Sequence, residues 1–192
     1  MDREIRSRRG AIGAFLMALL AGVACGGGDA GRTAGGDAGS TAGEASEATG
    51  LAVCELLSDE EVTQVLPGHD GGIVTSAGGS LIEGIDVYRC SYTARKDGIA
   101  AFDLLNVSVT VAATAELFDQ VRPDAGPKRD AYDNFAEIDS GDGGYTYGDP
   151  DEMMVDVWQG TMAVALELVA ADAASQTDRL VALAATALSK AN

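Results

Sequence analysis

The stretch LNVSVTV, residues 105–111, alternates apolar and polar side chains without interruption. Successive side chains of a β-strand point to opposite faces, so this alternation produces one apolar and one polar face. A strand with one face in water is typical of an antiparallel sheet, because parallel sheets are covered on both faces. The stretch therefore predicts an antiparallel sheet that has one dry face and one wet face.

Further strands are expected on both sides of this stretch. Residues 85–93 alternate before it, and Lys96-Asp97-Gly98 predicts a hairpin turn between the two strands. Residues 153–158 and 161–169 flank Gln159-Gly160, which predicts a second hairpin. Glycine-rich surroundings leave room for two shorter strands, at residues 73–75 and 145–147.

Helices are expected at both ends of this strand-rich region and within it. Ser58-Asp59-Glu60-Glu61 has the spacing of a capping box, which begins a short helix that ends at Pro67-Gly68. Residues 114–122 predict a second helix, and residues 175–190 form an alanine-rich amphipathic one. The order of elements predicts an α+β domain over residues 51–192: a single antiparallel sheet with helices packed on one face.

The first 24 residues have the pattern of a secretory signal. Arginines dominate the first ten residues, and residues 11–24 carry no charge. That apolar run is too short to span a bilayer, which needs about 20 apolar residues. Small residues lead directly into Cys25, and this junction resembles the bacterial lipoprotein signal. The resemblance implies cleavage before Cys25 and diacylation of its thiol; the alternative is an ordinary cleaved signal with an incidental cysteine.

Residues 25–50 are expected to be a lipidated cysteine followed by a disordered Gly/Ala/Ser tether. The tract after Cys25 contains no large apolar side chain, so it buries too little surface to offset its ordering entropy. Two or three acyl chains give a stable membrane anchor, whereas one chain gives a marginal one. We therefore expect an extracytoplasmic domain held at a cell membrane, inner or outer, by its lipid.

The charge balance limits the partners of the folded part. The chain holds 30 acidic against 13 basic residues, and four of the basic ones lie in the signal region. Nucleic acid is not an expected partner, because phosphate backbones are bound by clustered Lys and Arg. The expected partners are the membrane, through the anchor, and an envelope protein or a small ligand.

Cys54 and Cys90 remain once Cys25 is assigned to the lipid. An even pair of cysteines in an exported chain indicates a disulfide, with two free thiols or half of a metal site as alternatives. A zinc site needs about four clustered ligands, and the chain has a single histidine, His69. We expect no metal and no cofactor.

A family resemblance follows from three short motifs. Residues 54–62, CELLSDEEV, are similar to the C-x-L-L-[ST]-x-x-E-V opening of a family of uncharacterised bacterial lipoproteins abundant in actinobacteria. Cys90-Ser91-Tyr92 resembles that family's second cysteine, and Gly141-Asp142-Gly143-Gly144-Tyr145 resembles its late turn. The resemblance implies a Cys54–Cys90 disulfide and an antiparallel sheet with helices. It implies no catalytic residue.

No motif in the sequence points to catalysis. His69 lies in a loop without the G-x-S-x-G elbow of serine hydrolases. Acidic residues gather between 139 and 152, but their spacing does not match an EF-hand, and turn formation explains them. We therefore expect a non-enzymatic ligand- or protein-binding module of the cell envelope. The alternatives are an envelope-polymer hydrolase that uses Asp or Glu residues and a lipid carrier with an apolar cavity.

Overall fold

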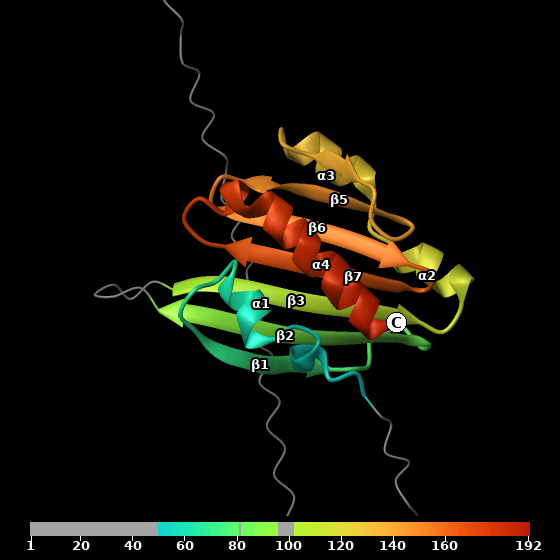
Figure 1. Ribbon diagram of the computed structural model, residues 1–192. Helices are drawn as coiled ribbons and strands as arrows, with labels where there is room; N and C mark the ends of the chain where they lie inside the picture. Colours follow the sequence, from blue (N-terminus) through green and yellow to red (C-terminus); the bar gives the residue numbers. More distant parts are fainter. Residues whose placement is uncertain (1–49, 81, 96–101) are drawn as a thin grey trace, which may run out of the picture. The chain divides into compact units, whose positions relative to one another are not determined.

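The computed structural model of the protein describes residues 50–80, 82–95 and 102–192 (Figure 1). The expected signal peptide, Cys25, the tether up to residue 49 and the turn at 96–98 lie outside the described residues. The helical elements are η1 (Val53–Glu55), α1 (Asp59–Thr63), α2 (Ala115–Val121), α3 (Ala125–Ala131), η2 (Ala173–Gln176) and α4 (Thr177–Ala191). The strands are β1 (His69–Ala77), β2 (Ile85–Arg95), β3 (Phe102–Ala112), β4 (Ala136–Ile138), β5 (Gly143–Asp149), β6 (Glu152–Gln159) and β7 (Met162–Val169).

The seven strands form a single antiparallel sheet in the order β1-β2-β3-β7-β6-β5-β4. This order is two meanders, β1 to β3 and β4 to β7, which meet where β3 pairs with β7 in the middle of the sheet (Figure 1). The segment that holds α2 and α3 connects the two meanders. The prediction of an α+β fold with one antiparallel sheet is confirmed.

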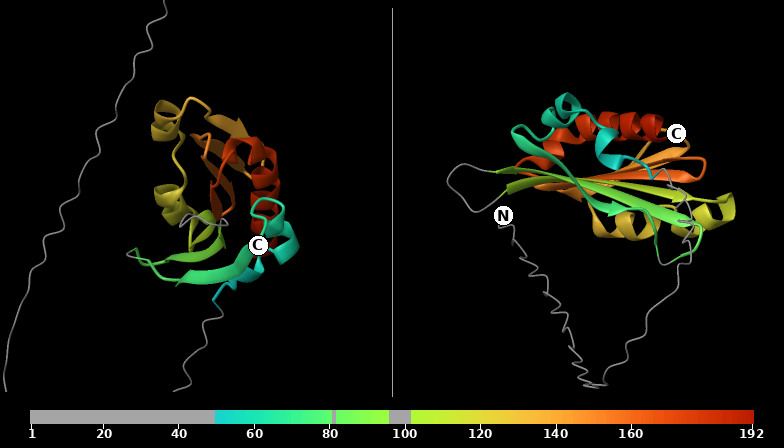
Figure 2. Two further views of the ribbon diagram at one scale, coloured as in Figure 1. Left: turned by 90° about the vertical axis from the view of Figure 1, so that its left-hand side faces the viewer. Right: turned by 90° about the horizontal axis from the view of Figure 1, so that it is seen from below.

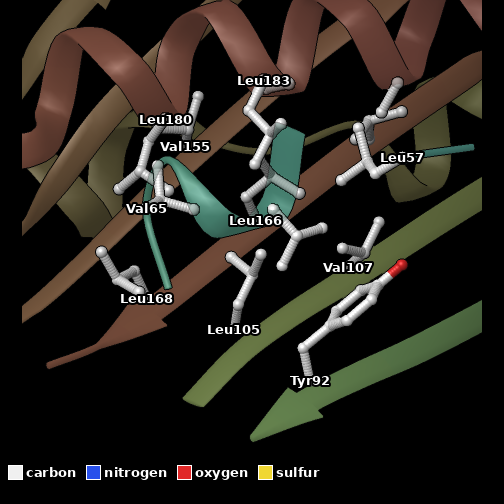
Figure 3. Close-up of a cluster of buried hydrophobic side chains, with 14 of the residues drawn as sticks. Leu57, Val65, Tyr92, Leu105, Val107, Val155, Leu166, Leu168, Leu180 and Leu183 are labelled. Atoms are coloured by element: carbon white, nitrogen blue, oxygen red, sulfur yellow. The ribbon is translucent and has the colours of Figure 1, made fainter. Parts of the chain in front are cut away.

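The alternation of residues 105–111 determines the dry face of the sheet. Leu105, Val107 and Val109 of β3 are fully buried, and Leu166 of β7 pairs directly with Val107. The amphipathic helix α4 packs its leucines on this face (Figure 3). The cluster buries side chains from η1, α1, η2, α4 and four strands, so it is the main core of the domain.

The capping box forms as predicted at the start of α1. The Ser58 hydroxyl accepts from the Glu61 backbone N–H, and the Glu61 carboxylate accepts from the Ser58 backbone N–H at 2.7 Å. Leu57 and Val62, on either side of the cap, are both buried in the main core. Two donors that the first helical turn cannot satisfy are thus satisfied by side chains.

The Cys54–Cys90 disulfide is present, with the two Cα atoms 5.2 Å apart. It joins η1 to β2 on the dry face, where Cys90 is fully buried. Tyr92, two residues along β2, donates its hydroxyl to the Cys54 carbonyl at 3.0 Å. The N-terminal end of the domain is therefore held to the sheet by one covalent bond and one hydrogen bond.

The helices are not confined to one face, which differs from the expectation. In Figure 2, α1 and α4 lie on one side of the sheet, and α2 and α3 lie on the other. The wet face is apolar at one end, where Ile85, Ala112, Ala163 and Trp158 form a second cluster with Phe118 of α2. Because these side chains need cover, α2 packs over them.

Two strands differ from the sequence predictions. β1 is nine residues long, although we expected a short strand at 73–75, and positive backbone φ at Gly71 accompanies a register shift in its pairing with β2. β4 was not predicted, because three residues give no periodic signal. It extends the sheet by one short edge strand beside β5.

Candidate functional site

A groove crosses the face of the sheet opposite α4. Its cavity volume is about 570 Å³, within the range of pockets that hold small ligands. Six strands contribute to it, with polar or charged side chains at Thr75, Arg89, Asn106, Glu167, Asp156 and Tyr147. We call this surface the groove face, and we call the opposite surface, covered by α1 and α4, the core face.

A hydrogen-bonded ladder crosses the centre of the groove face. Ser91, Asn106 and Glu167 occupy the same row of β2, β3 and β7, because each is paired with the next in the register of the sheet. The Ser91 hydroxyl donates to Asn106 Oδ1 at 2.7 Å, and Asn106 Nδ2 donates to Glu167 Oε2 at 2.8 Å. The ladder fixes the orientation of the amide and of one carboxylate oxygen.

A buried ion pair closes the groove at the β5–β6 end. Lys128 of α3 contacts Asp156, whose side chain is only 7% exposed, and the Tyr147 hydroxyl donates to Asp156 Oδ2 at 3.0 Å. The Lys128 ammonium also lies 4.6 Å from the centre of the Tyr147 ring. Burial and the neighbouring Asp156 carboxylate raise the pKa of Tyr147, so this hydroxyl remains protonated at neutral pH.

Two carboxylates lie close together beside the ladder. Burial raises the pKa of Glu152, and the charge of Glu167 together with a side-chain hydrogen bond to Glu167 raises it further. The Asn106 amide donates to the second carboxylate, Glu167, at 2.8 Å. Two acidic side chains therefore lie together on the groove face.

Arg89 places a positive charge at the other end of the groove. It lies on β2 beside Ser108 of β3 in the register of the sheet, and Thr75 of β1 lines the same end. Within the part of the chain that the structure describes, no ion pair or hydrogen bond involves the Arg89 guanidinium. An arginine with free donors binds carboxylate or phosphate groups through two parallel hydrogen bonds.

The residues singled out in the sequence lie away from this groove. Cys54 and Cys90 belong to the core face, and Cys25 lies outside the described residues. The ring nitrogens of His69 contact Thr63, Asp59 and Gly71, all nearby in the chain. These contacts are consistent with a structural role for the histidine.

The acidic segment 139–152 has turn roles at two positions. Asp142 accepts from the Gly160 N–H at 2.7 Å, and Asp151 accepts from the Asp172 N–H at 3.3 Å. Among the described residues, no group of three or more His, Cys, Asp or Glu side chains is arranged to hold a metal ion. Within the same residues, no helix is long and apolar enough to cross a membrane.

The groove residues themselves were not identified from the sequence. Their signal is the polar half of the strand alternation, at Asn106 and Ser108 of β3 and Glu167 of β7. The alternation alone predicts that these polar side chains face water. It does not predict that they become neighbours, because that depends on the order of the strands in the sheet. Comparison of the chain with protein-family models, curated proteins and solved structures gives no match.

Proposed function

We propose that this protein is a lipid-anchored extracytoplasmic domain of the cell envelope that binds a small polar ligand in the groove. The observation that carries the proposal is the groove itself, which holds fixed hydrogen-bonding groups and unlike charges on the face of the sheet opposite α4. The family of actinobacterial-type lipoproteins with the C-x-L-L-[ST]-x-x-E-V motif remains the proposed family.

The construction of the groove supports binding. Its floor is a sheet whose core face is fully packed, so the positions of Asn106 and Glu167 are set by the fold. Rigid elements place binding groups more accurately than loops do. Apolar atoms form the larger part of the lining surface, but eight of the twelve lining residues carry polar or charged side chains. These side chains suit a polar ligand better than the acyl chain of a lipid carrier.

A ligand screen with a groove-filling variant tests the binding role. The thermal unfolding temperature of the full chain is measured with amino acids, short peptides, sugars and nucleotides. Ser108→Phe places a ring in the groove, and Ser189→Phe places the same ring at an exposed position of α4. We expect at least one class of compound to stabilise the wild type and Ser189→Phe but not Ser108→Phe. Equal stabilisation of all three proteins, or of none, would exclude the groove as the binding site.

The anchor has a separate test. The basic start of the chain, the uncharged residues 11–24 and the small residues before Cys25 support lipidation of that cysteine. Cys25→Ser is expected to move the protein from the membrane fraction to the soluble fraction, or to leave it as the unprocessed precursor. Unchanged membrane association at the mature mass would contradict lipidation.

A second candidate function is hydrolysis of an envelope polymer. The pair of Glu152 and Glu167 favours it, because a carboxyl group of raised pKa beside a second carboxyl group is the arrangement used in acid–base catalysis. The test is turnover of peptidoglycan or glycans. This alternative is established if Glu152→Gln abolishes the turnover and the control Glu137→Gln, on the edge strand β4, retains it.

A further inference from the structure

We propose that the ligand of the groove is a short peptide with free termini, two or three residues long, whose carboxylate binds Arg89 and whose ammonium group binds Glu167. This inference rests on the proposed binding function and specifies the chemistry of the ligand. Arg89 lies at one end of the groove and Glu167 at its centre, and the distance between them and the groups around them select the ligand.

The positive end fits a carboxylate. Arg89 lines the groove as an exposed residue without a side-chain partner in the described part of the chain, and Thr75 and Ser108, which carry hydroxyls, line the same end. A guanidinium and hydroxyl donors are the groups that bind carboxylates in proteins. The other basic residue at the groove, Lys128, is already paired with Asp156 and is therefore not available.

The acidic site at Glu167, in the ladder at the centre of the groove, fits an ammonium group. Asn106 donates to only one oxygen of Glu167, and the second carboxylate, Glu152, lies close by. Two neighbouring carboxylates repel each other, and a cation between them removes that repulsion. Asp156 is less suited to the ammonium group, because the Lys128 ammonium already balances its charge.

The separation of Arg89 and Glu167 selects the length of the ligand. Arg89 on β2 and Glu167 on β7 are two strand spacings apart, about 10 Å, and they are also offset by two residues, about 7 Å, because Arg89 pairs with Ser108 and Ser108 pairs with Ala165. Their Cα atoms are therefore about 12 Å apart. An extended chain covers about 3.3–3.6 Å per residue, so two or three residues span about 7–11 Å of the space between the two side chains. A single α-amino acid is too short to reach from Arg89 to Glu167, and the termini of a much longer extended peptide would lie too far apart to meet both residues.

The groove floor matches a peptide backbone. Between Arg89 and Glu167 lie the Ser91 hydroxyl and the Asn106 amide, which hydrogen-bond to peptide N–H and C=O groups. Met154 of β6 also lines the groove and offers a flexible apolar contact for a small side chain. The groove therefore recognises both the termini and the main chain of the peptide.

Trialanine and its blocked derivatives test the inference on the unaltered full chain. Binding is measured by isothermal titration calorimetry with trialanine, N-acetyl-trialanine and trialanine amide. We expect trialanine to bind, and each blocked derivative to bind about tenfold more weakly or worse, since each loses a charge-assisted contact. Equal affinity of the three peptides, or no binding of trialanine, would overturn the inference.

Variants assign each terminus to its residue. In Arg89→Gln the preference for trialanine over its amide should disappear, and in Glu167→Gln the preference over the acetylated peptide should disappear. Arg95→Gln, at the exposed end of the same strand, is the matched control and should keep both preferences. If Arg89→Gln still prefers trialanine over trialanine amide, the assignment of the peptide carboxylate to Arg89 is contradicted.

The outcome also separates the inference from the proposed function. If the blocked peptides bind as well as trialanine, and Ser108→Phe still abolishes binding, the ligand class is wrong and the groove remains the binding site. If no compound of the broader screen depends on the groove, the proposed function fails, and the peptide inference fails with it.

Discussion

Leu166 and Glu167 are neighbours on β7, but their side chains lie on opposite faces of the sheet. Leu166 is fully buried under α4 in the core face, whereas Glu167 lines the groove and accepts a hydrogen bond from Asn106. The same contrast recurs on β3, between Val107 and Asn106. One set of strands thus carries a stabilising face and a face that holds the groove.

Substitutions on the two faces should change the free energy of unfolding by different amounts. Removal of a buried side chain from the core face loses its transfer free energy and leaves a cavity. Removal of a polar side chain from the groove face costs about 1 kcal/mol or less when water can replace its hydrogen bonds. The core face should therefore dominate the free energy of unfolding, and the groove face should dominate binding.

The largest expected effect is on the core face, at the disulfide. Replacement of Cys54 and Cys90 by Ala removes a cross-link with a sequence separation of 36 residues. The chain-entropy relation gives a loss of about 4 kcal/mol in the free energy of unfolding, measured by denaturant titration. Ser91→Ala, next to Cys90 on the groove face, is the control and should cost about 1 kcal/mol or less. Similar losses in the two proteins would remove the distinction between the faces.

A matched pair of neighbours gives the next largest effect. Leu166→Ala should cost about 3 kcal/mol, because it opens a cavity in the main core. Glu167→Gln keeps the size and the hydrogen-bonding oxygen of the side chain, so we expect a change within about 1 kcal/mol. Denaturant titrations of both variants provide the test. A larger loss of unfolding free energy in Glu167→Gln than in Leu166→Ala would contradict the claim that the core face dominates stability.

The buried ion pair is where the groove face itself contributes to stability. Lys128→Met leaves the Asp156 carboxylate without its cation. Unpaired buried charges cost about 3–5 kcal/mol, and since the Lys128 side chain is 21% exposed we expect about 2 kcal/mol here. Asp156→Asn added to Lys128→Met should restore part of the loss. If Lys128→Met is as stable as the wild type, the ion pair holds neither α3 nor the end of the groove in place.

The smallest effect concerns the capping box of α1. The Ser58 backbone N–H and the Lys190 ammonium lower the pKa of Glu61 to about 2, from an ordinary value of 4.5. Because the folded-state pKa is lowered, the stabilisation is present above about pH 4.5 and is lost as the pH falls towards 2. Glu61→Gln should therefore cost about 1 kcal/mol at pH 7 and nearly nothing at pH 2.

Glu60→Gln is the control for this titration, since its side chain is exposed on the same helix. It should leave the dependence of stability on pH unchanged between pH 7 and 2. A constant difference between Glu61→Gln and the wild type over that range would contradict the role of the ionised carboxylate.

The sequence predicts the core face much better than the groove face. Alternation in residues 105–111, the capping box at Ser58 and the amphipathic stripe of α4 are local patterns, and each forms as expected. The position of α3 depends on the Lys128–Asp156 contact, which joins residues far apart in the chain. The ladder from Ser91 to Glu167 depends on the pairing of β3 with β7, a long-range choice that no local pattern specifies.

The second apolar cluster shows the same limit. Ala112 and Ala163 are small, and Ile85 begins its strand, so none of them forms a periodic stripe in the sequence. Their apolar character becomes visible only when three strands bring them together with Trp158 under α2. The expectation of helices on one face failed because of this end of the sheet.

Two adjacent methionines offer the most direct test of the different roles of the faces. The Met153 side chain is buried in the core face, and Met154 lines the groove. In the full chain labelled with ¹³C at the methionine methyl groups, we predict that trialanine shifts the Met154 resonance and leaves the Met153 resonance in place. An unchanged Met154 resonance at saturating trialanine, or equal shifts of both resonances, would contradict the account.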